Sequence, residues 1–200
     1  MIRNYIKSAF RTLLKNKFYS LINIIGLTVG LATGLLILIW VQDEFSYDKF
    51  EHNGANLYKV NANMGTEVSK QVWNAVPGPI AVWAKREIPE VLDATRIRGN
   101  YTYTVFRYKD RRFTEQNSVF VDPSFFKLFD ISFINGNRNN PFPALNSVLL
   151  TETTARKYFG TTDATGRYIS ANGQTDFLVA GIVHDSPKNS SIRFTMLFPM

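Results

Sequence analysis

Few side chains in this sequence could take part in catalysis or metal binding. The 200 residues include two histidines, His52 and His184, and no cysteine. Asp48, Glu51 and His52 could share one face of a helix, but three polar residues do not make up a full ligand set with the spacing of known zinc sites. We therefore expect no metal ion and no other cofactor, and we expect these three side chains to be solvated.

The sequence motifs of common enzyme classes are also missing. The chain has no phosphate-binding loop of the form G-x-x-x-x-G-K-[ST], no dinucleotide fingerprint G-x-G-x-x-G and no nucleophile elbow G-x-S-x-G. Phosphate cradling and Ser-His-Asp catalysis therefore have no basis in the sequence. We predict that the chain is not an enzyme and that it has no catalytic and no cofactor-binding residue.

Basic residues alternate with tyrosines between positions 96 and 112. The cluster consists of Arg96, Arg98, Arg107, Lys109, Arg111 and Arg112, with Tyr101, Tyr103 and Tyr108 among them. Such interleaving occurs in proteins that bind single-stranded nucleic acid, but it also describes the polar face of a β-meander. The net charge is +7, and the first 17 residues supply +5 of it, leaving +2 for the rest. We favour the structural interpretation and expect no nucleic-acid partner.

An uncharged stretch of 24 residues, from Phe18 to Val41, dominates the organisation of the chain. A helix of that length reaches roughly 36 Å, enough to cross a hydrocarbon core of about 30 Å with some tilt. A cleaved signal peptide fits less well, because its apolar core has about 7–15 residues and small residues precede the cut. This stretch instead ends in Ile39-Trp40-Val41. We predict one transmembrane helix over residues 18–41, with Trp40 at the membrane interface.

The residues before this stretch have the pattern of a basic amphipathic helix. Arg3, Lys7, Arg11 and Lys15 recur every four residues, opposite apolar residues that fall at helical spacing, and Lys17 adds a fifth positive charge. Acidic residues follow the stretch, at positions 43, 44 and 48. This asymmetry predicts a cytoplasmic N-terminus. We expect residues 1–17 to lie on the anionic inner leaflet, with membrane lipid as a partner.

Three glycines lie in register within the predicted transmembrane helix. Gly26, Gly30 and Gly34 recur every four residues, which places them on one helix face. Small residues at this spacing let a second helix backbone approach closely, although glycine is also common in membrane helices in general. We favour a helix-packing face.

The remaining residues, about 155, are enough for one core or two small ones. Their pattern predicts an α+β fold, a mixed α/β domain outside the cytoplasm over residues 46–200. We expect strands at 57–62 and 68–73 around a turn at 64–65, a helix at 79–87, a meander of strands at 101–108, 112–114 and 118–121, a helical turn at 123–129, strands at 131–134 and 147–150, a helix at 152–159 capped by Gly160, and a hairpin of strands 168–171 and 175–183 across Asn172-Gly173.

Four blocks in this order resemble the permeases of MacB/FtsX-type ABC transporters. They are FSYDKFEHNGANLYKV (45–60), VFVDPSFFKLFDISFINGN (119–137), VLLTETTARKYFG (148–160) and FLVAGIVHDSPKNSSIRF (177–194). The resemblance covers nearly the whole chain. It implies that residues 46–200 are a MacB-like extracytoplasmic core domain, inserted after the first span and incomplete at its C-terminal end.

The resemblance also implies a function. Permeases of this family pair with a nucleotide-binding ATPase, usually dimerise, and relay ATP-driven motion to their outer domain for export or for control of a periplasmic partner. We therefore expect a cognate ATPase, a homodimer or heterodimer of permeases, and a place in the cell inner membrane. The alternative is a membrane-anchored sensor whose outer domain binds a ligand. An anchored hydrolase is opposed by the missing catalytic motifs.

Overall fold

The structure, a computed structural model, describes residues 2–66, 69 and 71–200. It divides into two compact units, Met1–Tyr47 and Asp48–Met200. Each unit is described by itself.

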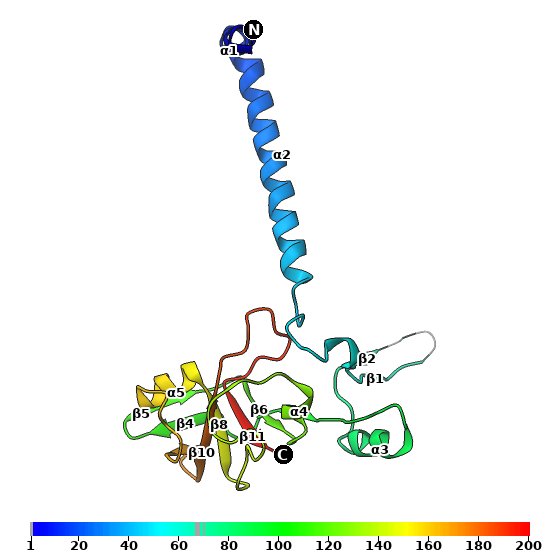
Figure 1. Cartoon of the computed structure of the whole chain (residues 1–200), viewed down its shortest axis with the longest axis vertical. Coiled ribbons are helices and arrows are strands. Elements are labelled where there is room, and N and C mark those ends of the chain that lie inside the picture. Colours follow the sequence, from blue (N-terminus) through cyan, green and yellow to red (C-terminus); the bar gives the residue numbers. More distant parts are fainter. Residues whose placement is uncertain (1, 67–68, 70) are drawn as a thin grey trace. The chain divides into compact units, whose positions relative to one another are not determined.

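The first unit consists of two helices, α1 (Ile2–Lys15) and α2 (Lys17–Glu44). Asn16, with φ −109° and ψ 56°, interrupts the helical backbone between them, so the chain turns sharply there (Figure 1). The Ser20 hydroxyl donates to the Leu13 carbonyl across this turn at 3.1 Å. Both predicted helices are therefore present, and α2 runs on beyond the uncharged stretch to Glu44.

The second unit begins with a segment that has almost no core of its own. It carries a 3-10 turn η1 (Gly54–Asn56), the short strands β1 (Ala62–Asn63) and β2 (Val72–Trp73), helix α3 (Pro79–Glu87) and strand β3 (Ile97–Gly99). None of the described residues between 48 and 99 is buried. Ten large apolar side chains of this segment are exposed: Tyr58, Val60, Met64, Val72, Trp73, Val82, Trp83, Ile88, Leu92 and Ile97.

The predicted hairpin at 57–73 forms only in part. Ala62 pairs with Trp73 and Asn63 with Val72, but residues 57–61 are not a strand. Residues 67, 68 and 70, which include part of the second expected strand, lie outside the described residues. Two paired residues on each side leave little to stabilise a ladder, since isolated two-stranded ribbons are marginal in water. The predicted helix at 79–87 is confirmed as α3.

A mixed sheet forms the body of the second unit. Its remaining elements are β4 (Val105–Tyr108), β5 (Arg111–Thr114), β6 (Ser118–Val121), α4 (Phe125–Leu128), β7 (Phe133–Asn135), β8 (Ser147–Thr151), α5 (Glu152–Phe159), β9 (Tyr168–Ala171), β10 (Thr175–Val183) and β11 (Met196–Pro199). The strand order is β3-β6-β11-β8-β10-β9-β4-β5, and β7 pairs with β10. The pairs β10–β8 and β11–β6 are parallel.

The predicted meander over 101–121 is wrong. β4 and β5 pair across the turn at Lys109-Asp110, as expected, but β6 lies between β3 and β11 in the other half of the sheet. The physical reason is that β6 packs apolar side chains on both faces, Phe120 against one cluster and Val119 and Val121 against another. A strand of this kind belongs inside a sheet rather than at the end of a meander.

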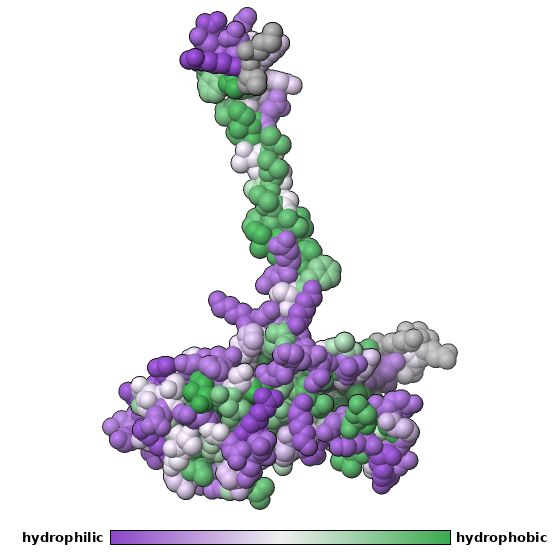
Figure 2. All heavy atoms as spheres, viewed as in Figure 1, coloured by the Kyte–Doolittle hydropathy of each residue, from purple (hydrophilic) through white to green (hydrophobic). Residues whose placement is uncertain are grey.

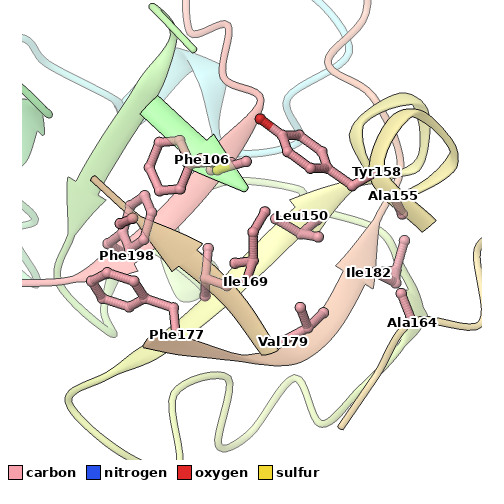
Figure 3. Close-up of a cluster of buried hydrophobic side chains, with 13 residues drawn as sticks. Phe106, Leu150, Ala155, Tyr158, Ala164, Ile169, Phe177, Val179, Ile182 and Phe198 are labelled. Carbon is pink, nitrogen blue, oxygen red and sulfur yellow. The ribbon is translucent and has the colours of Figure 1, made fainter. Parts of the chain in front are cut away.

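The two faces of the sheet carry two separate hydrophobic clusters. The first contains Phe106, Leu150, Tyr158, Phe177 and Phe198, and Figure 3 shows the Tyr158 ring reaching from α5 to the margin of this cluster. The second contains Val121, Phe125, Phe126, Leu149, Val183, Phe194 and Leu197, and α4 contributes two of its phenylalanines. The predicted α+β class is therefore confirmed.

Two turns that the sequence predicts carry their expected backbone geometry. Gly160 ends α5 in the left-handed conformation, with φ 74°, which glycine adopts without steric cost. Asn172 and Gly173 both have positive φ between β9 and β10, and the Gln174 amide donates to the Ala171 carbonyl at 3.0 Å. The α5 helix and the 168–183 hairpin are thus confirmed.

Candidate functional site: the membrane anchor and the segment that follows it

Helix α1 has the two faces that the sequence predicts. Its basic residues, Arg3, Lys7, Arg11 and Lys15, are exposed along the helix. Its apolar side chains are exposed as well: Tyr5, Ile6, Phe10, Leu13 and Leu14. An amphipathic helix with both faces uncovered in the chain itself is suited to a surface that is apolar on one side and charged on the other.

Helix α2 is long and apolar enough to cross a membrane, and in the described residues it is the one helix with that property. It begins at Lys17, and Trp40 lies near its far end with 66% of its surface exposed. Figure 2 shows an apolar band along α2 between hydrophilic ends. Inside the helix, the hydroxyls of Thr28 and Thr33 donate to the carbonyls of Ile24 and Val29 at 2.7 and 2.9 Å. These bonds satisfy polar groups that lipid could not.

The glycine face of α2 is open. A Cβ atom built at Gly26, Gly30 or Gly34 would meet no atom within 4 Å beyond the neighbouring helix backbone. The three positions therefore form a smooth stripe on the helix surface, and nothing else in the described chain covers it.

Asp48, the first residue of the second unit, is hydrogen-bonded to the loop that precedes β11. The Asp48 carboxylate accepts the Ser191 amide at 2.8 Å and also the Ser191 hydroxyl. In return, the Asp48 amide donates to the Asn189 carbonyl at 2.9 Å. Asp48 has φ 55°, a left-handed conformation that aspartate tolerates better than most residues. We call residues 48–52 the post-span segment.

A second set of contacts ties the post-span segment to the loop between α4 and β7. The His52 amide and ring Nδ1 both contact the Asp130 carboxylate at 2.7 Å, and the Asp130 amide donates to Glu51 at 2.8 Å. The two hydrogen bonds from His52 hold the pKa of Asp130 below its usual range. Partial burial raises the pKa of Glu51, because desolvation disfavours its charged form.

A groove of about 330 Å³ runs under the post-span segment. It is lined by four phenylalanines and by several polar side chains: Phe50, Phe125, Phe129 and Phe194, with Glu51, His52, Asp130, His184 and Asp185. Among the residues that the structure describes, no group of three acidic or histidine side chains has a geometry that could hold a metal ion.

The basic cluster at 96–112 does not form one surface. Arg96 makes a two-pronged ion pair with Asp122, at 2.6 and 2.8 Å, and Arg98 lies over the Phe120 ring. At the opposite end of the sheet, Arg111 donates to two carbonyls near the end of α5. Arg107 and Arg112 pair across β4 and β5. A continuous track for a nucleic-acid strand is thus absent from these residues.

The sequence did not predict the contacts of Asp48, Glu51 and His52, which were expected to be solvated. Their partners lie 78 to 143 residues away along the chain. The one available signal was that the segment and its partners fall inside the four blocks that carry the family resemblance. The structure gives these polar residues an anchoring role instead of a chemical one.

Comparison with protein-family models gives one match, the MacB-like periplasmic core domain, over residues 20–200. Among solved structures, a domain of a candidate permease protein from Porphyromonas gingivalis is similar, with a TM-score of 0.58 and 27% identity over 66% of this chain and 55% of that chain. The periplasmic region of MacB from Actinobacillus actinomycetemcomitans matches with a TM-score of 0.45 and 15% identity over 60% and 52% of the two chains.

The extracellular domain of the noncanonic ABC-type transporter YknZ from Gram-positive bacteria matches with a TM-score of 0.40 and 16% identity, covering 52% of each chain. The chain spans about half the length of these solved structures. No curated protein matches.

Proposed function

The chain belongs to the family with a MacB-like periplasmic core domain, and from this premise we propose that it is the permease subunit of an ABC-type complex. In this family, the domain is the periplasmic part of a transporter permease. In our proposal, the chain relays movement driven by a partner ATPase to its own outer domain. The result is export of a substrate or control of a partner outside the cytoplasm.

The proposed topology places α1 on the cytoplasmic surface of the inner membrane, α2 across it, and residues 46–200 outside. The exposed basic face of α1 supports this orientation, because positive charge is retained on the cytoplasmic side. The exposed apolar face of α1 supports contact with lipid. Lys17 and Trp40 mark the two ends of the proposed span.

The open glycine stripe of α2 is the proposed contact with another membrane helix, in a homodimer or heterodimer of permeases. Replacing Gly30 by Leu would fill the stripe and push the two backbones apart. Leu36→Ala is the control, because it changes a lipid-facing side chain without filling the stripe. If disulfide crosslinking between spans is the same for both variants, the glycine stripe faces lipid and this part of the proposal fails.

The main support for the proposed relay is the set of hydrogen bonds that attach the post-span segment to the outer domain. Asp48 lies four residues after the end of α2, and its carboxylate and amide bond to a loop 141 to 143 residues further along the chain. Glu51 and His52 bond to Asp130 in a different loop. A displacement of the span is therefore passed on to two separate parts of the outer domain by hydrogen bonds rather than by a free linker.

The ATPase must come from a partner subunit or domain, because the sequence contains no phosphate-binding loop. The missing catalytic motifs support a chain that is not an enzyme. The groove beside the post-span segment favours the alternative, a membrane-anchored sensor, because a lining of aromatic side chains with a few polar groups is common in ligand pockets. In that case a ligand, and not ATP, would move the segment.

The test uses the permease reconstituted with its ATPase in proteoliposomes. A donor dye on a cysteine at position 145, whose Leu side chain is 88% exposed, reports distance to an acceptor in the lipid surface. ATP should change energy transfer in the unmodified protein and leave it unchanged in Asp48→Ala, while ATP hydrolysis continues. The control is Asp163→Ala, which removes an exposed carboxylate outside the post-span segment.

Three results would go against the proposal. If Asp48→Ala preserves the ATP-dependent change, the post-span segment does not carry the movement. If energy transfer responds to a small molecule and never to ATP, the sensor interpretation is correct. If an impermeant thiol reagent labels a cysteine at position 8 and not one at the exposed position 145 in intact cells, the orientation is the reverse of the proposed one.

A further inference from the structure

Strand β5 is the free edge of the nine-stranded sheet at the end opposite β3. It pairs with β4 alone, over four residues, and the Glu115 amide continues this pairing by donating to the Thr104 carbonyl at 2.9 Å. Alternate residues of an antiparallel strand present their backbone groups to opposite sides. The amides and carbonyls of Arg112 and Thr114 therefore face away from β4, where another strand could pair with them.

The side chains beside this edge carry unbalanced positive charge. Arg112 lies directly opposite Arg107 across the β4–β5 pair, and both are exposed. Like charges in opposite positions destabilise a sheet. Within residues 2–66, 69 and 71–200, no carboxylate oxygen lies within 4 Å of either guanidinium. Two arginines thus occupy directly opposed positions of the sheet without a carboxylate partner in the described part of the chain.

The next positions of the same row do not neutralise the pair. Arg107 is opposite Ser170 on β9, and Ser170 is opposite Asp176 on β10. Asp176 is therefore two strands from Arg107, about 10 Å away. The core clusters lie elsewhere: the side chains of Phe106 and Phe113, adjacent in sequence to these arginines, point into the first cluster. The arginines stand on the opposite face.

We propose that β5 receives an extended acidic segment of a partner protein as an additional strand. Backbone hydrogen bonds to Arg112 and Thr114 would hold the segment, and carboxylates at alternate positions would pair with Arg112 and Arg107. This mode of recognition combines a sheet edge for affinity with side chains for specificity. The inference rests on the proposed function only in placing the partner outside the cytoplasm.

A competing explanation is that basic side chains merely protect the edge from pairing with other chains, as charged residues do on many edge strands. That role explains a charge on the edge strand β5, but it does not explain Arg107, which lies on β4 between β5 and β9. Arg111, by contrast, already has partners at the end of α5 at 3.0 and 3.2 Å. Arg107 and Arg112, in contrast to Arg111, have no carboxylate or backbone partner among the described residues that would explain their position.

The test measures binding by the full 200-residue chain in nanodiscs of zwitterionic lipid, without any ATPase, so that its failure is separate from failure of the proposed relay. The probe is a fluorescent peptide of alternating Glu and Val residues, and the comparison probe has Lys in place of Glu. The unmodified chain should bind the Glu peptide at least about tenfold more tightly than the Lys peptide.

Arg112→Glu should weaken binding of the Glu peptide at least about tenfold. It should not lower the denaturation midpoint, because it places opposite charges across the β4–β5 pair. Thr114→Pro removes an outward amide while both arginines stay, and it should weaken binding to a similar degree. Lys59→Glu is the matched control, since it makes the same change of charge at an exposed lysine away from the sheet. It should change affinity by less than about twofold.

Four outcomes would overturn the proposal. Equal binding of the two peptides would remove the charge specificity. Equal effects of Arg112→Glu and Lys59→Glu would show general electrostatic attraction. Full binding by Thr114→Pro would exclude strand addition. Self-association of the chain that Arg112→Glu abolishes would assign the edge to a second copy of this chain.

Discussion

Replacing Asp48 by Ala should release the whole post-span segment from the outer domain, not only the hydrogen bonds that Asp48 itself makes. The variant removes the acceptor of two bonds from Ser191. Both partners are partly solvated, so we assign about 1 kcal/mol to each bond. The left-handed backbone of Asp48 adds up to about 1 kcal/mol, because alanine is strained there. The local free energy of opening should fall by roughly 2–3 kcal/mol.

Hydrogen exchange is the assay, with the His52 amide as reporter. This amide donates to Asp130 at 2.7 Å and makes no direct contact with the Asp48 side chain. If the segment opens as one unit, a loss of 2–3 kcal/mol corresponds to roughly 30- to 150-fold faster exchange. The Thr195 amide, which donates to the Asn117 carbonyl inside the sheet, should keep its rate.

The control variant is Asp163→Ala, which should leave the His52 amide unchanged. If the His52 amide exchanges at the same rate in Asp48→Ala as in the unmodified protein, the two sets of contacts open independently. The post-span segment would then not open as a single unit. Equal acceleration at Thr195 would mean that the variant unfolds the whole domain, and the prediction of a local opening would then be wrong.

Three further predictions concern the outer domain. Gly181→Ala should destabilise it by at least about 2 kcal/mol in chemical denaturation, because a Cβ there would meet the Asn135 carbonyl oxygen at 2.6 Å. The ion pair with Arg96 holds the pKa of Asp122 below its usual value in the folded protein. The pair therefore stabilises the fold fully at pH values above the carboxyl pKa of the unfolded chain, about 3.9. This stabilisation is lost as the pH falls through the lower pKa of the folded state. Asp122→Asn should therefore cost about 1–2 kcal/mol at neutral pH, and the difference from the unmodified protein should shrink in acid denaturation. Burial raises the pKa of Tyr158 far above its usual value, so spectrophotometric titration should find one tyrosine that ionises only when the domain unfolds.

The sequence predicted the local elements well, because their signals lie within a few residues. The end of helix α5 follows from Gly160, and the β9–β10 turn follows from Asn172-Gly173. The amphipathic helix α1 and the apolar helix α2 follow in the same way from the periodicity and charge of residues 2–41. In each case one short window contains the physical cause of the structure.

The order of strands was not predictable in this way. Residues 101–121 contain three strand signals in succession, and the simplest arrangement pairs neighbours. The deciding facts lie elsewhere: Ser118 pairs with Met196, and Val121 pairs with Pro199 and Ile97. Choosing between these pairings requires the packing of the two faces of β6, and a single sequence without its fold does not contain that information.

The polar contacts of the candidate site were unpredictable for a related reason. An exposed aspartate near a membrane exit looks the same in sequence whether it is solvated or bonded to a distant loop. Asp48 and Ser191 are 143 residues apart, so no local pattern reports their contact. Only the family resemblance marked both regions, and it gave no role to either residue.

The absence of buried residues between positions 48 and 99, among those described, bears on how force can pass through the outer domain. A segment without a hydrophobic core of its own is held in place by the bonds at its ends. At its start these are the contacts of Asp48, Glu51 and His52, and toward its end the Arg96–Asp122 ion pair. Exposed hydrogen bonds of this kind are individually weak. In the proposed relay, the segment should therefore open before the sheet, which has a hydrophobic cluster on each face.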